Sequence, residues 1–147
     1  MIYFDSAYIA KCYLPEPGHA EVLSLAESDG DVVSSLLARA EVAAVFHRKL
    51  REKDLAPAAM REVRAQFDSD CRSGLWRFLP IGVESIIAVA AAYARLPANL
   101  FLRSADCIHL VAARMAGCGA IYSSDRHVLA AAARFGLDGI DVVPSAR

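Results

Sequence analysis

Four acidic side chains stand at positions from which they could do chemistry together. Asp5 directly follows the short apolar run Met1–Phe4, which predicts a buried strand, and Asp125 follows a second such run by two residues. Asp106 lies in the first turn of a helix that is expected to begin at Ser104. Taken alone, each aspartate fits the ordinary role of an acid at a helix N-terminus, where it accepts backbone N–H groups and complements the helix dipole.

Glu41 is harder to explain in this way. It lies in the second turn of a predicted helix, too far from the helix start to accept the free N–H groups. Apart from Arg39, its neighbours along the helix are apolar. The residue is therefore either a solvated glutamate on an otherwise buried helix or a member of a site.

Carboxylates from four separate segments would repel one another if they met, and some would stay protonated. A divalent cation removes that conflict. Carboxylate oxygens without clustered histidine or cysteine are hard ligands, which suit Mg²⁺ or Mn²⁺. Such ions lower the pKa of bound water and stabilise charge on the oxygens of a phosphodiester, so the chemistry indicated is phosphodiester hydrolysis.

The elements that would position these acids alternate between strands and helices. Strands are expected at Met1–Phe4, Val32–Val33, Leu75–Leu79, Ala120–Ser123 and Ile140–Val143. Helices are expected at Ala7–Tyr13, Glu16–Glu27, Leu36–Lys53, from Pro57 to Gly74, at Val83–Leu96, from Ser104 to Met115, and from Ser124 or Asp125 to Phe135. This order predicts a three-layer α/β/α fold with a mostly parallel, twisted sheet of about five short strands.

Individual residues predict where several of these elements begin. Ser34 or Ser35 is expected to cap the helix that follows the second strand, and Ser104 the helix that carries Asp106. In parallel sheets ligands bind beyond the carboxyl ends of the strands, so Asp5 and Asp125 are expected at the same edge. No repeat or linker interrupts the chain, which predicts a single domain over residues 1–147.

The composition limits the choice of partners. The chain has 147 residues, 56% of them hydrophobic, and a net charge of −1, so any site for a polyanion must come from local clusters of basic residues. The four cysteines are scattered, and the chain shows neither a signal-peptide pattern nor an apolar stretch long enough to span a membrane. We expect a cytoplasmic protein with reduced thiols.

Four stretches together resemble PIN-domain ribonucleases of the VapC toxin type. They are IYFDSAYIAK around Asp5, SSLLARAEVAAVF around Glu41, LRSADCIHLVAA around Asp106 and YSSDRHVLAAA around Asp125. They span nearly the whole chain, in the order of the family and at about its spacing. The resemblance implies a PIN-like fold, an acidic pocket that binds Mg²⁺ or Mn²⁺, and an endoribonuclease selective for single strands. It also implies a homodimer and neutralisation by a small cognate antitoxin (VapB-like) whose C-terminal segment lies over the active site.

Carried over by position, the four acids of the family's pattern fall on Asp5, Glu41, Asp106 and Asp125. In the mechanism that we expect, Asp5 and Asp106 hold the principal ion, Glu41 binds a second ion or orients the attacking water, and Asp125 completes the negative pocket. Ser6 and Ser123 stand where family members often have threonine, and both keep the hydroxyl. The products implied carry a 5′-phosphate and a 3′-hydroxyl.

Other residues give weaker signals. Arg103 is the preferred candidate for an RNA contact, whereas the basic run Arg48–Lys53 fits a solvated helix face at least as well. His109 shares a helix face with Asp106, three residues earlier, and is either a further ligand or a packed core histidine, of which we favour the second. The loop Leu100–Leu102 and the two helices that follow the first two strands carry more apolar surface than one sheet face hides, which suggests partner contacts.

Three alternatives remain open from the sequence. A haloacid-dehalogenase-like phosphatase would need a second aspartate two residues after Asp5, where this chain has Ala7, and the acidic pair and lysine of a receiver domain are not evident. A catalytically weak PIN-like binding module would keep the fold without turnover. A PIN nuclease outside a toxin–antitoxin pair would keep the chemistry without the partner.

Overall fold

Five short strands form one sheet in which every neighbouring pair is parallel. The computed structural model describes residues 1–143. The strands are β1 (Ile2–Phe4), β2 (Val32–Ser35), β3 (Arg77–Leu79), β4 (Ala120–Tyr122) and β5 (Asp138–Ile140), in the spatial order β3-β2-β1-β4-β5. The helices are α1 (Ser6–Lys11), α2 (His19–Asp29), α3 (Leu37–Arg51), α4 (Pro57–Ser73), α5 (Val83–Tyr93), α6 (Ser104–Met115) and α7 (Arg126–Ala132), the last continuing as a 3₁₀ turn over Ala133–Phe135.

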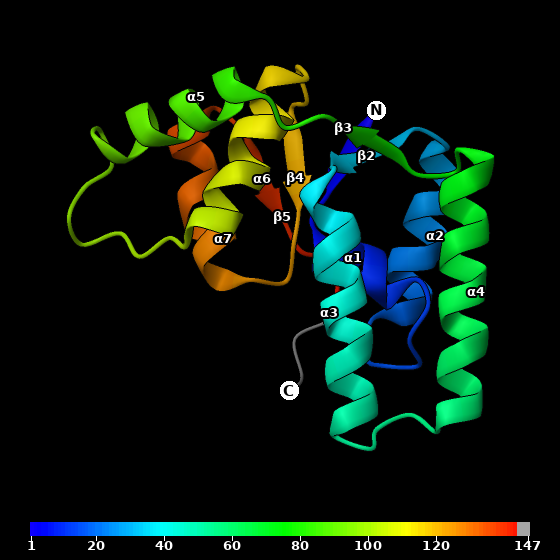
Figure 1. Cartoon of the computed structure of the whole chain (residues 1–147). Coiled ribbons are helices and arrows are strands. Elements are labelled where there is room, and N and C mark those ends of the chain that lie inside the picture. Colours follow the sequence, from blue (N-terminus) through cyan, green and yellow to red (C-terminus); the bar gives the residue numbers. More distant parts are fainter. Residues whose placement is uncertain (144–147) are drawn as a thin grey trace.

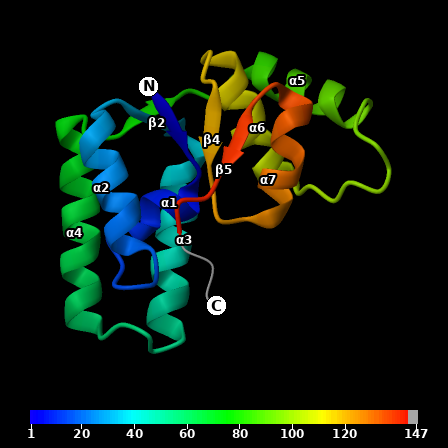
Figure 2. The ribbon, with the colours of Figure 1, turned by 180° about the vertical axis from the view of Figure 1, so that it is seen from behind.

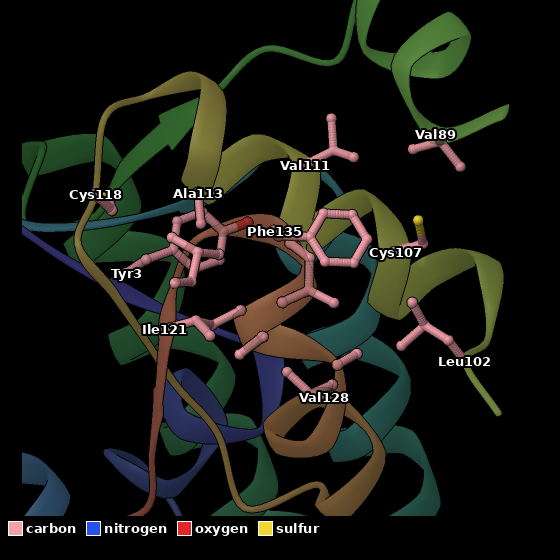
Figure 3. Close-up of a cluster of buried hydrophobic side chains, with 14 of the residues drawn as sticks. Tyr3, Val89, Leu102, Cys107, Val111, Ala113, Cys118, Ile121, Val128 and Phe135 are labelled. Atoms are coloured by element: carbon pink, nitrogen blue, oxygen red, sulfur yellow. The ribbon is translucent and has the colours of Figure 1, made fainter. Parts of the chain in front are cut away.

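The helices cover both faces of the sheet, which confirms the predicted three-layer α/β fold (Figure 1). Successive residues of a strand point to opposite faces, and this alternation divides the core in two. Tyr3 and Ile121 point into the cluster beneath α5, α6 and α7, part of which is drawn in Figure 3. Phe4 and Val32 point into the cluster beneath α1 to α4. Figure 2 shows these four helices from behind.

The order of the strands singles out one point of the sheet edge. β2 and β3 extend the sheet on one side of β1, whereas β4 and β5 extend it on the other. Ligands of open parallel sheets bind beyond the carboxyl ends of the strands where the order reverses, which here is between β1 and β4. Asp5 follows β1 at that point, and its backbone N–H donates to Tyr122 O of β4 at 3.1 Å.

Several boundaries differ from the sequence prediction. Ser34 and Ser35 are buried within β2 and cap nothing, and α3 begins without a side-chain cap. Ser104 is likewise the first residue of α6, after Arg103 in the capping position. The last strand lies at Asp138–Ile140 and not at Ile140–Val143, because Gly136 turns the chain in the left-handed region at φ 71°.

The apolar surface lies only partly where it was predicted. α1 buries Tyr8, Ile9 and Ala10, and in the loop before α6 Leu102 is buried while Phe101 is 59% exposed. α5 instead presents large apolar side chains to solvent: Val83 is 77% exposed and Ile87 62%. Within residues 1–143, no helix combines the length and the apolar character that a membrane crossing would need.

Candidate active site

Asp5 is fixed at the carboxyl end of β1, where it is 6% exposed. Its Oδ1 accepts the backbone N–H of Tyr8 at 2.9 Å and so caps α1. Burial raises the pKa of this carboxyl, and the negative charge of Glu41 adds to the rise. Hydrogen bonding from Ser123 and from the Tyr8 N–H opposes it. Asp5 is thus a carboxylate held in a place that disfavours its negative charge unless positive charge is near.

Ser123 connects the ends of β1 and β4. Its side chain is fully buried, and its Oγ accepts the backbone N–H of Asp125 at 2.9 Å. Its hydroxyl also lies close enough to Asp5 to lower the pKa of that carboxyl. Asp125 in turn accepts the His127 N–H at 2.7 Å and caps α7. The capping roles of Asp5 and Asp125 therefore coexist with their positions beyond the ends of β1 and β4.

Arg103 forms hydrogen bonds with two acidic side chains, those of Asp106 and Asp125. Its Nε donates to Asp106 Oδ2 at 2.8 Å, and one terminal nitrogen donates to Asp125 Oδ2 at 2.7 Å. Hydrogen bonding and charge from Asp106, with the charges of Asp125 and Glu41, raise the pKa of the Arg103 guanidinium. The Arg103 side chain is 60% exposed, whereas Asp106 is buried. The acids at this edge thus already hold one solvent-accessible cation.

Glu41 is held by a partner from the interior. Its Oε2 lies 2.6 Å from Nε2 of His109, a residue that is 2% exposed. Burial alone would raise the pKa of Glu41, but the hydrogen bond from His109, together with Ser6 and Arg103, lowers it overall. The half-buried Glu41 is therefore an ionised side chain of the site rather than a solvated residue on the outer face of α3.

The fold brings every acid proposed from the sequence to one edge of the sheet, together with Ser6, Ser123 and Arg103. They are joined through Ser123, Arg103 and mutual charge interactions. Within residues 1–143, no three acidic, histidine or cysteine side chains are arranged to hold a metal ion as they stand. The donor chemistry nevertheless fits a hard cation, because the pocket offers carboxylate oxygens and already attracts the Arg103 guanidinium.

Two site residues were not recognised from the sequence. His109 is packed in the core as predicted, but it also contacts Glu41, and its other ring nitrogen lies 2.8 Å from the hydroxyl of Tyr3. Tyr3 is separated from His109 by 106 residues, so no local pattern links the two. The one available signal was a histidine within an apolar helix, three residues after an acid of the site.

Comparison with known proteins agrees with this architecture. The profile of the PIN domain family matches residues 2–134. A search among curated proteins finds no match. The structure of FitAcB from Neisseria gonorrhoeae is similar, with a TM-score of 0.74 at 16% identity over 95% of this chain and 96% of that chain. VapC20 of Mycobacterium tuberculosis, a toxin that cleaves the sarcin-ricin loop, gives a TM-score of 0.72 at 16% identity over 98% and 100% of the two chains.

At this level of identity the two solved structures establish a shared fold and nothing finer. The family profile covers all four acids and most of the chain. The order of the elements, the parallel sheet and the acidic edge are consistent with it. The chain therefore belongs to the PIN domain family.

Proposed function

We propose that this protein is a metal-dependent endoribonuclease toxin of the VapC type, which cleaves single-stranded RNA by attack of water on the phosphodiester. PIN domains are nucleases, which supports a hydrolase acting on phosphodiester bonds. The observation that carries the proposal is the meeting of Asp5, Glu41, Asp106 and Asp125, from four separate segments, at the sheet edge beyond β1 and β4.

In this proposal Asp5 and Asp106 would hold a Mg²⁺ or Mn²⁺ ion. When bound, the ion supplies a more acidic water and neutralises charge on the phosphate oxygens. Asp5 suits this role because its position is fixed by α1 and its burial favours a cationic partner. Glu41 orients the attacking water through the oxygen that His109 does not engage, and Asp125 completes the negative pocket.

Arg103 supplies the positive charge that an RNA backbone requires near an acidic pocket. Its guanidinium is exposed at the mouth of the site while its other contacts are carboxylates. Arginine binds phosphate oxygens with paired, charge-assisted hydrogen bonds, so an approaching phosphodiester can replace a carboxylate as its partner. We assign to Arg103 the contact with the phosphate next to the scissile bond.

We propose two protein partners, an antitoxin that binds at the acidic site and a second copy of the chain that binds at α5. The similar VapC20 is itself a toxin, which supports a small cognate antitoxin as the inhibitor. A basic antitoxin side chain could enter the acidic pocket in the way that Arg103 already does. The apolar face of α5 supports a homodimer, because large exposed apolar patches mark protein contacts.

The decisive experiment is cleavage of a mixed single-stranded RNA by the purified protein with Mg²⁺, with Mn²⁺, and with excess chelator. Asp5→Asn tests the site, and Asp138→Asn, an exposed acid at the start of β5, is the matched control. We expect cleavage with metal by the wild type and by Asp138→Asn alone, with 5′-phosphate products. Equal cleavage in chelator would refute the proposal, and so would products with a 2′,3′-cyclic phosphate.

Expression in a bacterial host separates the toxin from a binding module. We expect growth arrest with the wild type, none with Asp5→Asn, and relief when the antitoxin is supplied. A protein that neither cuts RNA nor arrests growth would be a catalytically weak binding module. Cleavage without arrest would favour a PIN nuclease outside a toxin–antitoxin pair.

A further inference from the structure

A chain of polar groups crosses the otherwise apolar core beneath α6. The Tyr3 hydroxyl accepts the backbone N–H of Ser35 at 2.9 Å and lies 2.8 Å from Nδ1 of His109. His109 Nε2 lies 2.6 Å from Glu41 Oε2. Tyr3 is fully buried, among the apolar side chains drawn in Figure 3, and His109 is nearly so. The chain therefore runs from the end of β2, through β1 and α6, to the acid on α3.

The direction of each hydrogen bond follows from what the groups can donate. The carboxylate of Glu41 only accepts, so Nε2 of His109 carries a proton and donates it. On a neutral ring Nδ1 then carries no proton and accepts, so the Tyr3 hydroxyl, whose oxygen accepts the Ser35 N–H, donates its own proton to Nδ1. Tyr3 thus selects the tautomer of His109 that can hold Glu41.

This arrangement restricts a side chain that is otherwise flexible. A glutamate has several rotatable bonds, and fixing one of its oxygens reduces the freedom of the other. Buried polar groups are costly when unpaired, and here both ring nitrogens of His109 have partners. The chain also ties α6 to α3, since His109 lies one turn after Asp106 on the same helix. It therefore sets the position of Glu41 relative to Asp106.

We propose that Tyr3 and His109 are positioning residues for Glu41, which orient its free carboxylate oxygen toward the reacting phosphodiester. The inference rests on the proposed nuclease function and deepens it, because it assigns a task to two interior residues that touch neither RNA nor ion. It predicts that a single hydroxyl in the core, that of Tyr3, affects the rate of cleavage at the surface.

The first test compares substitutions that keep the volume of the core. His109→Leu removes both hydrogen bonds, whereas His109→Gln keeps an N–H donor near the place of Nε2. Removal of outer-shell partners commonly costs about 10- to 100-fold in activity. We expect a loss of kcat of this order for His109→Leu, with KM for RNA changed less than about twofold, and recovery of most of kcat in His109→Gln. Tyr3→Phe is expected to have a smaller effect in the same direction.

A matched control and a double-mutant cycle separate positioning from general damage. Tyr13→Phe also deletes a core hydroxyl with two partners, Asp70 and Trp76, but on the other face of the sheet. We expect it to leave kcat unchanged. In a Glu41→Gln background, neither Tyr3→Phe nor His109→Leu should lower kcat further, because their effect passes through the carboxylate. Additive losses would overturn the inference.

A readout without RNA or metal makes the inference independent of activity. Nitrogen NMR of the imidazole rings should show His109 with its proton on Nε2, and Glu41→Gln should shift the His109 signals more than those of the other histidines. A neutral ring protonated on Nδ1 would overturn the inference. A folded His109→Leu that cleaves like the wild type would overturn it while leaving the nuclease function intact. A wild type that cleaves nothing would refute the proposed function, and the NMR result would then decide the inference alone.

Discussion

Asp5 combines two roles that can be separated by substitution. Its carboxylate caps α1 through the Tyr8 N–H, and it also carries negative charge in a buried place near Glu41. Asparagine retains a side-chain acceptor for the cap, whereas alanine loses it. The two substitutions therefore remove the same charge, and only asparagine keeps an acceptor for the Tyr8 N–H and the Ser123 hydroxyl.

We predict that Asp5→Ala is about 1 kcal/mol less stable than Asp5→Asn, the usual contribution of a helix N-cap. Urea unfolding of both variants in chelator measures the difference. Asp5→Asn should be at least as stable as the wild type under these conditions, because it removes a buried negative charge beside Glu41. Equal stabilities of the asparagine and alanine variants would show that the cap contributes nothing.

Arg103 competes with a metal ion for the same carboxylates. We predict that Arg103→Gln raises the affinity of the RNA-free protein for Mn²⁺ about two- to fivefold, which corresponds to the roughly 0.5–1 kcal/mol of an exposed ion pair. Titration calorimetry measures this affinity. The same substitution should weaken RNA binding, since it removes the proposed phosphate contact. Arg114→Gln, in the last turn of α6, is the control. Unchanged Mn²⁺ affinity would contradict the competition.

The positions of the acidic residues could be predicted from the sequence better than the residues that contact them. Asp5 and Asp125 were placed correctly at one edge because each follows a strand, and parallel strands end together. The contact between His109 and Glu41 could not be predicted, since it depends on how closely α6 packs against α3. The buried histidine was correctly assigned to the core, and its second role became visible only with its neighbours in place.

At the level of elements, the main error concerned the end of β2. The residues Val32–Ser35 read equally well as a short strand followed by a serine cap or as a longer strand. The second description holds because β3 pairs along this whole stretch, with Ser34 opposite Phe78 and Ser35 opposite Leu79. A partner strand more than forty positions away thus decided a boundary that local propensity left ambiguous.

β5 packs closely against α7 because Gly139 has no side chain. A Cβ at Gly139 would lie 3.0 Å from the backbone of Leu129, whereas a Cβ at Gly119 would meet nothing within 4 Å. We predict that Gly139→Ala destabilises the fold by about 1–3 kcal/mol, the typical cost of overpacking, and that Gly119→Ala does not. Chemical denaturation of the two variants checks this. If the two variants proved equally stable, the helix would be shown to move away easily.

At the scale of the whole molecule, the many apolar residues of the sequence are divided between the core and the surface. Many of them fill the two clusters on either side of the sheet, including the α1 residues that the sequence suggested would remain exposed. Others are exposed, and α5 contributes Val83, Ile86 and Ile87 to these. The sequence alone could not separate the buried from the exposed apolar residues, because both α1 and α5 are apolar helices whose burial depends on what packs over them.

We predict that α5 mediates the proposed homodimer. Ile87→Glu should shift the protein from dimer to monomer in sedimentation or light scattering, because a charge would be buried in an apolar contact. Leu75→Glu, which replaces an apolar residue of similar exposure away from α5, should leave the dimer intact. A dimer that persists in Ile87→Glu would place the interface elsewhere.

The dual use of Asp5 and Asp125 has a consequence for selection. If the protein arrests growth, cells that survive its expression carry mutations that silence it, and substitutions at these two positions can remove a helix cap together with an acid. Many survivors would then produce a toxin that is degraded as well as inactive. Glu41 caps no helix, so Glu41→Gln, which keeps an acceptor for His109, should give a folded, silent protein that can still occupy its antitoxin. Such a mutant would release other toxin molecules from inhibition, and silent alleles of one gene would then differ in their effect on the cell.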